Sequence, residues 1–265
     1  MAPVLGHTAY GISRWHHGDL RASSHHLDAA RAAAHAVPPE TMDDVLFNLD
    51  QLRLSLPFSV YLHDLLGDLD DAEAHYDELV RRLRDDRYWE LAVMNVAASG
   101  ALSTGDLARA ERAARRGLAA DPEEMCAFWG SAGRCYLGAA LALQGNLDEG
   151  LPLLEEAWAH YTAMGLRTDG VTLLASRAMA LAEAGRLDEA TTSLQEARGE
   201  LDAYQERHAE PTLVLADAVL RHARGDDPAE VGKTLAEAVD VASAQGGMGM
   251  AARVRATAER LGYVI

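Results

Sequence analysis

Six short turns that begin with glycine divide the chain at nearly regular intervals. They start at Gly18, Gly67, Gly105, Gly145, Gly185 and Gly225, so that successive turns lie 49, 38, 40, 40 and 40 residues apart. Glycine readily adopts the left-handed conformation that ends a helix, and the Asp or Asn that follows five of these glycines can cap the next helix. A period of about 40 residues built on such turns predicts a stack of helix pairs.

Small residues flank the turns at helical spacing. Five residues after the first five turn glycines lie Ser23, Ala72, Ala110, Gly150 and Ala190. Seven residues before five of the six turn glycines lie Gly11, Ala98, Gly138, Ala178 and Ala218. Val60, seven residues before Gly67, is the exception. Small side chains at these positions let two helices cross closely. The composition agrees, because the chain is 49% hydrophobic but only 6% aromatic, which favours an all-α fold over a β-rich one.

The turns and prolines define the expected helices. These cover 4–17, 20–36, 42–66, 69–85, 88–104, 107–120, 123–144, 147–164, 167–184, 187–208, 211–224, 228–245 and 248–261. Val37-Pro38-Pro39-Glu40 should break the chain, Pro57 predicts a kink or break in the third helix, and Asp121-Pro122 is a helix-start signal. We expect one domain over 1–265, with repeats at 3–36, 42–85, 88–120, 123–164, 167–208 and 211–246 and a cap at 248–261.

The arrangement of small residue, turn glycine and second small residue resembles the tetratricopeptide repeat. Such a resemblance implies a right-handed α-solenoid of about six helix pairs with a C-terminal capping helix. The phrases GDLRASSHHLDAARA, LGAALALQGNLDEGLPLLEEAWAHYTAMG and AEAVDVASAQGGMGMAARVRATAERLG are similar to the C-terminal sensor region of bacterial LuxR-type and maltose-regulon-activator-like ATPase transcriptional regulators. No G-x-x-x-x-G-K-[ST] occurs in the chain, so only the sensor arm of those regulators is resembled.

Charge and motifs restrict the function further. The net charge is −17 with no basic block, which argues against direct nucleic-acid binding, and no apolar run is long enough for a membrane span, so a cytoplasmic protein is expected. Cys126 and Cys135 are expected to be reduced thiols, not a disulfide or a metal pair. No H-E-x-x-H or G-x-S-x-G occurs among the eleven histidines and the serines, so we expect no metal, no cofactor and no catalysis.

Candidate binding residues follow from the repeat itself. In tetratricopeptide architectures the first helix of each pair lines a concave groove, and its groove positions here include Tyr61, Asp64, Asn95, Ser99, Cys135, Met179 and His222. Eight residues before the turn glycine, where two earlier repeats have Ala97 and Leu137, the last two have Arg177 and Asp217. We expect these two to form an ion pair between repeats, either as a structural clasp or as part of a ligand-binding floor. Trp129 is expected either at the groove rim or in the core.

These features predict a non-catalytic binding module that senses a ligand or a protein for a bacterial transcriptional or signalling regulator. Its partner is a protein or peptide segment in the concave groove or, alternatively, a small-molecule effector in an enclosed pocket. An enzyme that uses the solenoid interior is a third alternative, and a homodimer is a further expectation. An open groove would favour the peptide, whereas a closed pocket with converging polar groups and a perturbed titratable residue would favour the effector or the enzyme.

Overall fold

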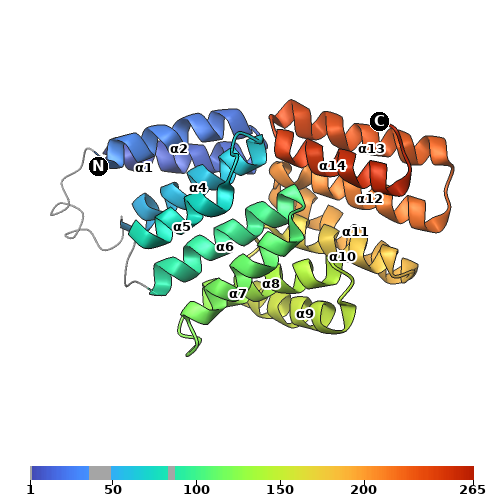
Figure 1. Ribbon diagram of the computed structural model, residues 1–265, viewed down its shortest axis with the longest axis horizontal. Coiled ribbons are helices and arrows are strands. Elements are labelled where there is room, and N and C mark those ends of the chain that lie inside the picture. The colour runs from blue at the N-terminus through green and yellow to red at the C-terminus, as the bar shows by residue number, and fades with distance from the viewer. Residues whose placement is uncertain (1, 36–48, 83–86) are drawn as a thin grey trace.

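The computed structural model of the chain describes residues 2–35, 49–82 and 87–265, and these ranges contain helices and no strand (Figure 1). The α-helices are α1 (Ala2–His16), α2 (Leu20–His35), α4 (Leu49–Leu66), α5 (Ala72–Arg82), α6 (Arg87–Thr104), α7 (Leu107–Ala120), α8 (Ala127–Leu143), α9 (Leu147–Ala163), α10 (Gly170–Glu183), α11 (Leu187–Tyr204), α12 (Glu210–Arg224), α13 (Pro228–Gln245) and α14 (Met248–Leu261). A 3₁₀ turn, η1 (Arg207–Ala209), joins α11 to α12. No described helix is both long and apolar enough to cross a bilayer.

The predicted glycine turns are confirmed. All six turn glycines have φ between 74° and 89°. At the third turn the amide of Asp106 donates to the carbonyl of Ala101 at 2.9 Å, which closes α6, and its side chain accepts from the amide of Arg109 at 3.0 Å, which starts α7. One residue after the glycine therefore ends one helix and caps the next.

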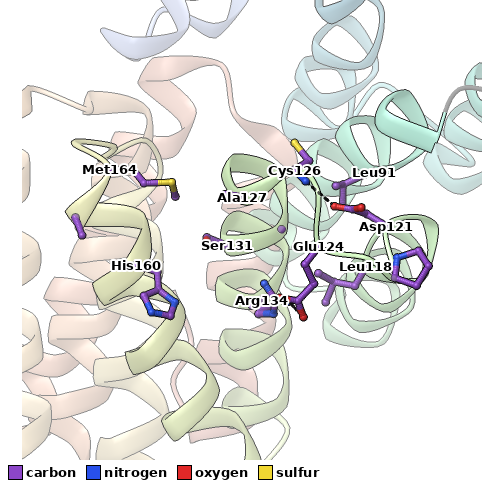
Figure 2. Close-up of a pocket in the computed structure, with 13 residues that line it drawn as sticks. Leu91, Leu118, Asp121, Glu124, Cys126, Ala127, Ser131, Arg134, His160 and Met164 are labelled. Atoms are coloured by element: carbon purple, nitrogen blue, oxygen red, sulfur yellow. Dashed lines mark hydrogen bonds and ion pairs between the residues drawn. The ribbon is translucent and has the colours of Figure 1, made fainter.

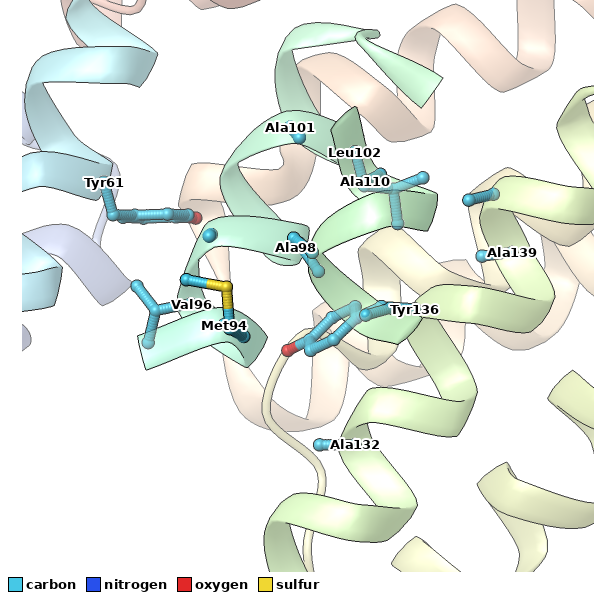
Figure 3. Close-up of a cluster of buried hydrophobic side chains, with 14 of the residues drawn as sticks. Tyr61, Met94, Val96, Ala98, Ala101, Leu102, Ala110, Ala132, Tyr136 and Ala139 are labelled. Atoms are coloured by element: carbon cyan, nitrogen blue, oxygen red, sulfur yellow. The ribbon is translucent and has the colours of Figure 1, made fainter. Parts of the chain in front are cut away.

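The predicted crossing positions are buried as well. A Cβ on Gly138 would lie 2.6 Å from the backbone nitrogen of Leu154, and one on Gly150 would lie 2.5 Å from that of Ala142. These two glycines therefore let α8 and α9 approach backbone to backbone. Figure 3 shows the neighbouring core around α6, with Tyr61 of α4 and Tyr136 of α8 on either side of it.

Several predicted helix ends are wrong. α8 begins at Ala127, not at 123, because Asp121 accepts the amides of Met125 and Cys126 at 3.0 and 2.8 Å and Glu124 is left-handed with φ 53°. α10 begins at Gly170, not at 167, because Asp169 is left-handed with φ 62°. α5 begins at Ala72, not at 69, and α11 ends at Tyr204, not at 208.

Pro57 does not interrupt its helix, since α4 continues from Leu49 to Leu66 with the proline inside it. The predicted break at 37–40 and the start of the third predicted helix lie outside the described residues.

The helices are compatible with an α-solenoid, because each packs with its partner in a pair and the first helices of consecutive pairs, α4, α6, α8, α10 and α12, pack side by side. The two ends of this stack also meet. α14 contacts α4 and α6 in addition to α12 and α13, and α1 contacts η1. Figure 1 shows the blue α1 and α2 beside the red end of the chain.

The closure involves close backbone contacts. A Cβ on Gly249 of α14 would lie 2.5 Å from the carbonyl oxygen of Asp64 at the end of α4. In the same closure, the ring nitrogen Nε2 of His16 at the end of α1 lies 2.7 Å from the carbonyl oxygen of Tyr204 at the end of α11. α14 has the predicted bounds of a cap, and in addition to α12 and α13 it contacts α4 and α6.

Candidate functional site

A cavity of about 360 Å³ lies between α1, α4, α6, α8, α9 and the loop before α10. Eight of the fifteen Trp, Tyr and Phe residues of the chain line it, although aromatic residues are scarce overall. These eight are Trp15, Phe58, Tyr61, Tyr88, Phe128, Trp129, Tyr136 and Tyr161. We call this cavity the aromatic pocket. Its volume falls in the range of small-molecule sites.

Asp169 is the one charged residue that lines the aromatic pocket among the described residues. It precedes α10, and its carboxylate Oδ2 accepts hydrogen bonds from Ser99 Oγ at 2.8 Å and from Tyr136 Oη at 2.6 Å. Oδ1 lies 3.3 Å from His208 Nε2. The side chains of Asp169 and His208 are only 6% and 2% exposed, so this is a buried charged cluster.

The cluster favours an ionised Asp169. Burial opposes its charge, but the hydrogen bond and charge of His208 and the hydroxyls of Tyr136 and Ser99 outweigh burial and hold the pKa of Asp169 below its ordinary value. The start of α10 also stabilises a negative charge there.

Glu206 binds the backbone of Asp169. Its carboxylate accepts the backbone amide of Asp169 at 3.0 Å, which holds the left-handed conformation of that residue. Burial, together with the negative charge of Asp169, raises the pKa of Glu206 to about 7. Glu206 is only 3% exposed, so it acts on the aromatic pocket through Asp169.

The aromatic pocket is completed by the closure of the stack. The ring of His208 in η1 lies against the indole of Trp15 in α1, with 4.0 Å between centroids and 30° between planes. Trp15 Nε1 donates to Tyr61 Oη at 3.3 Å. His208 does not itself line the aromatic pocket, but it contacts two residues that do, Trp15 and Asp169.

Two polar atoms of the lining residues have no hydrogen-bond partner among the described residues. They are Oδ1 of Asn95, a residue that is 1% exposed, and Nε1 of Trp129. The other amide atom of Asn95, Nδ2, donates to the carbonyl of Leu91 at 2.8 Å. Buried polar groups without a partner are costly, so one free acceptor and one free donor are a signature of a site that a ligand completes.

No protein-family model and no curated protein matches this chain.

The order of the cluster does not activate a nucleophile. A catalytic triad places histidine between the serine and the carboxylate so that the ring takes the serine proton. Here Asp169 lies in the middle, and Ser99 donates directly to the carboxylate. The cluster is built to hold a charge in a fixed position. In the described residues no group of three or more His, Cys, Asp or Glu could hold a metal ion.

Of the predicted site residues, the structure brings Tyr61, Asn95 and Ser99 together in the aromatic pocket. Trp129, for which the sequence left two alternatives, lines it as well. Asp64 lies outside, where its Oδ2 accepts from Arg109 Nη2 at 2.8 Å. Burial raises the pKa of Asp64, although Arg109 opposes this effect.

The other predicted groove residues do not line the aromatic pocket. Cys135 is completely buried in the core, which raises the pKa of its thiol to about 12. Met179 is buried in a second core cluster, and His222 Nδ1 lies 3.1 Å from Tyr263 Oη near the C-terminus. These positions line no common cavity with Asn95 and Ser99.

The predicted ion pair between Arg177 and Asp217 is wrong. Arg177 pairs with Glu155 at 2.6 Å and Glu196 at 3.4 Å. Asp217 pairs with two arginines, Arg198 and Arg221, each at 3.0 Å. Each charge finds partners on the second helices or on its own helix, which removes the need for a pair between first helices.

Sequence reasoning missed Asp169, Glu206 and His208. The available signal was Thr168-Asp169-Gly170 directly before an apolar run, which is typical of a helix start with an acidic cap. Asp169 lies inside the helix that was predicted to begin at 167, and so it was not treated as the residue before a helix start. Glu206 and His208 were hidden in the same way by a helix predicted to run to 208.

A second, larger cavity of about 550 Å³ lies at the start of α8 (Figure 2). Its charged side chains are already engaged: Arg134 pairs with Glu124 at 2.5 Å, and Asp121 accepts the amide of Cys126. None of its lining residues has a buried polar side-chain atom without a partner. The aromatic pocket is therefore the better candidate for a specific site.

Proposed function

We propose that this chain is a binding module that holds a small organic molecule in the aromatic pocket. The observation that carries this proposal is the concentration of eight aromatic side chains around one buried carboxylate in a chain that has few aromatic residues. Aromatic walls contribute large contact areas, and a few fixed polar groups orient the bound molecule.

The alternative of a peptide in an extended groove has less support. The aromatic side chains and the buried carboxylate surround one local cavity, as is typical of a small-molecule site. A bound molecule of the size of one amino acid fits a cavity of this volume better than a chain segment does.

The sensor role that the regulator resemblance implies is compatible with this proposal. Trp15 and Asp169 line the same cavity, and His208 contacts both of them. A molecule in the aromatic pocket would thus contact Trp15 and Asp169, the two lining residues that His208 connects, and would stabilise the closed form through its higher affinity for that form. Binding would be transmitted to a partner protein as a change in this equilibrium.

Native mass spectrometry of the freshly purified chain tests the proposal first, because a retained small molecule appears as a mass above that of the polypeptide. The second arm is a thermal-shift screen of small metabolite-like compounds with two variants. Ala132→Phe fills the aromatic pocket, where Ala132 is one of the lining residues, and Ala159→Phe adds the same ring on the exposed face of α9.

We expect Ala132→Phe to lose both the retained mass and the thermal shifts, while Ala159→Phe keeps them. Circular dichroism establishes that both variants are folded. Equal binding by a folded Ala132→Phe variant would place the ligand elsewhere and contradict the proposal.

A further inference from the structure

The aromatic pocket has a one-sided charge. Among its fifteen described lining residues there is no Lys, Arg or His, and the single charged residue is Asp169. The basic side chain that contacts that carboxylate, His208, is not among the lining residues and lies against Trp15, with an Nδ1 atom that has no described partner. The charge that faces the cavity itself is therefore negative.

Three neutral polar groups of the aromatic pocket present acceptor atoms. The hydroxyl groups of Tyr136 and Ser99 both donate their protons to Asp169. The lone pairs of both hydroxyl oxygens therefore remain as acceptors. Asn95 Oδ1 is an acceptor without a partner in a side chain that is 1% exposed. The faces of the aromatic rings are electron-rich as well, and they attract cations most strongly when water is excluded.

We propose that the occupant of the aromatic pocket is an organic cation, a protonated amine on an apolar or aromatic body. Its N–H groups donate to Asn95 Oδ1 and to the acceptor oxygens around Asp169, and its apolar body lies against the rings of α1, α4 and α8. Trp129 Nε1 is the free donor, so the molecule carries one acceptor, such as a hydroxyl or carbonyl oxygen. This inference rests on the proposed function, because it names the class of molecule that the aromatic pocket takes.

The test uses three compounds that share one skeleton and differ in charge. Tyramine has an ammonium group, tyrosol has a neutral hydroxyl in its place, and 4-hydroxyphenylacetate has a carboxylate. A parallel series of tryptamine, tryptophol and indole-3-acetate covers a larger ring. Binding is measured by isothermal titration calorimetry and by quenching of tryptophan fluorescence, since Trp15 and Trp129 line the aromatic pocket.

We expect the amine of at least one series to bind ten-fold or more tightly than its neutral counterpart, and the acid not to bind. Asp169→Asn should reduce amine affinity at least ten-fold and leave the affinity for the neutral compound unchanged. Because Asp169 is buried, Asn95→Ala provides a second variant that removes an acceptor without removing a charge. It should weaken amine binding selectively, and Gly199→Ala on the open face of α11 should change neither affinity.

Preferential binding of the neutral or acidic compounds would overturn the cation proposal, but the aromatic pocket would still be a ligand site if Ala132→Phe abolished that binding. If no amine of either series bound at millimolar concentration, the cation proposal would also fail. The proposed function would fail with it only if, in addition, the purified chain retained no small molecule and the screen gave no shift sensitive to Ala132→Phe.

Discussion

His208 lies against Trp15 with 4.0 Å between their ring centroids, although Trp15 belongs to the first helix and His208 to the 3₁₀ turn before α12. Trp15 also lines the aromatic pocket, and His208 lies 3.3 Å from the carboxylate of Asp169, a second lining residue. The contact therefore connects the closure with the lining of the aromatic pocket, and a ligand that contacts Trp15 and Asp169 favours the closed form.

Replacing Trp15 by Ala should weaken this closure. Trp15 is 4% exposed, and truncation of a buried Trp costs about 3–5 kcal/mol of unfolding free energy. Trp89→Ala is the matched control, because Trp89 is 2% exposed and lies near the start of α6, whereas Arg253 of α14 donates to the carbonyl of Ser103 at the other end of that helix. Urea denaturation should show a loss in both variants.

Hydrogen exchange separates the two effects. In Trp15→Ala the amides of η1 and α14 should exchange faster than the loss of overall stability alone would explain. In Trp89→Ala their exchange should increase only in proportion to the loss of overall stability. Equal protection of η1 and α14 in the two variants would show that the ring contact does not hold the ends together.

Glu206 should give the chain a distinctive pH dependence. Its pKa is about 7 when folded and near 4.5 in its ordinary state, so the folded chain holds this proton more tightly. The stability that protonated Glu206 contributes is complete below about pH 4.5 and is lost as pH rises through 7.

Glu206→Gln cannot ionise, so its stability relative to the unmodified chain should increase from pH 5 to pH 8. Urea denaturation at several pH values measures this difference. Glu156→Gln, an exposed change on α9, serves as the control. A difference for Glu206→Gln that stays constant with pH would mean that Glu206 is ionised throughout.

Gly138→Ala should be strongly destabilising because its Cβ would lie 2.6 Å from the Leu154 nitrogen. Such overpacking lowers the free energy of unfolding by about 1–3 kcal/mol or more. Gly199→Ala is the control within another helix, since a Cβ there meets nothing within 4 Å. That change should stabilise the chain by about 0.5–1 kcal/mol, the usual gain of Ala over Gly inside a helix. Thermal denaturation of the two variants should therefore shift the midpoint in opposite directions, and a shared direction would refute the tight crossing.

Asp106→Ala should remove the cap of α7. The side chain accepts from the Arg109 amide at 3.0 Å, and loss of such a cap costs about 1 kcal/mol. At the equivalent turn, Asn146 makes no capping hydrogen bond to the start of α9. Asn146→Ala should thus cost less than Asp106→Ala in chemical denaturation, and the reverse order would show that the two turns do not differ in this way.

The sequence predicted the parts of the fold that depend on local chemistry. Turn glycines such as Gly105 and crossing residues such as Gly138 obey rules that act within one helix pair, and both are as predicted. Tyr61, Asn95 and Ser99 were found for the same reason, because one repeat offset places a residue on the inner side of its helix.

The charged part of the candidate site could not be found in that way. Asp169 and His208 lie in segments where the chain leaves the repeat, and their juxtaposition with Trp15 depends on the curvature added up over the whole stack. Arg177 and Asp217 failed as a predicted pair because exposed arginines and carboxylates on neighbouring helices offered each of them closer partners.

The contact of Gly249 with the end of α4 has a consequence for how this chain can vary. A repeat protein whose repeats touch only their neighbours tolerates gain or loss of a unit, because each unit contributes its own increment of stability. Here the first and last units also touch, so the number of units fixes a circumference. Insertion or deletion of a helix pair between α4 and α14 would separate Gly249 from α4 and open this closure, so the spacing between these two helices is constrained by the structure.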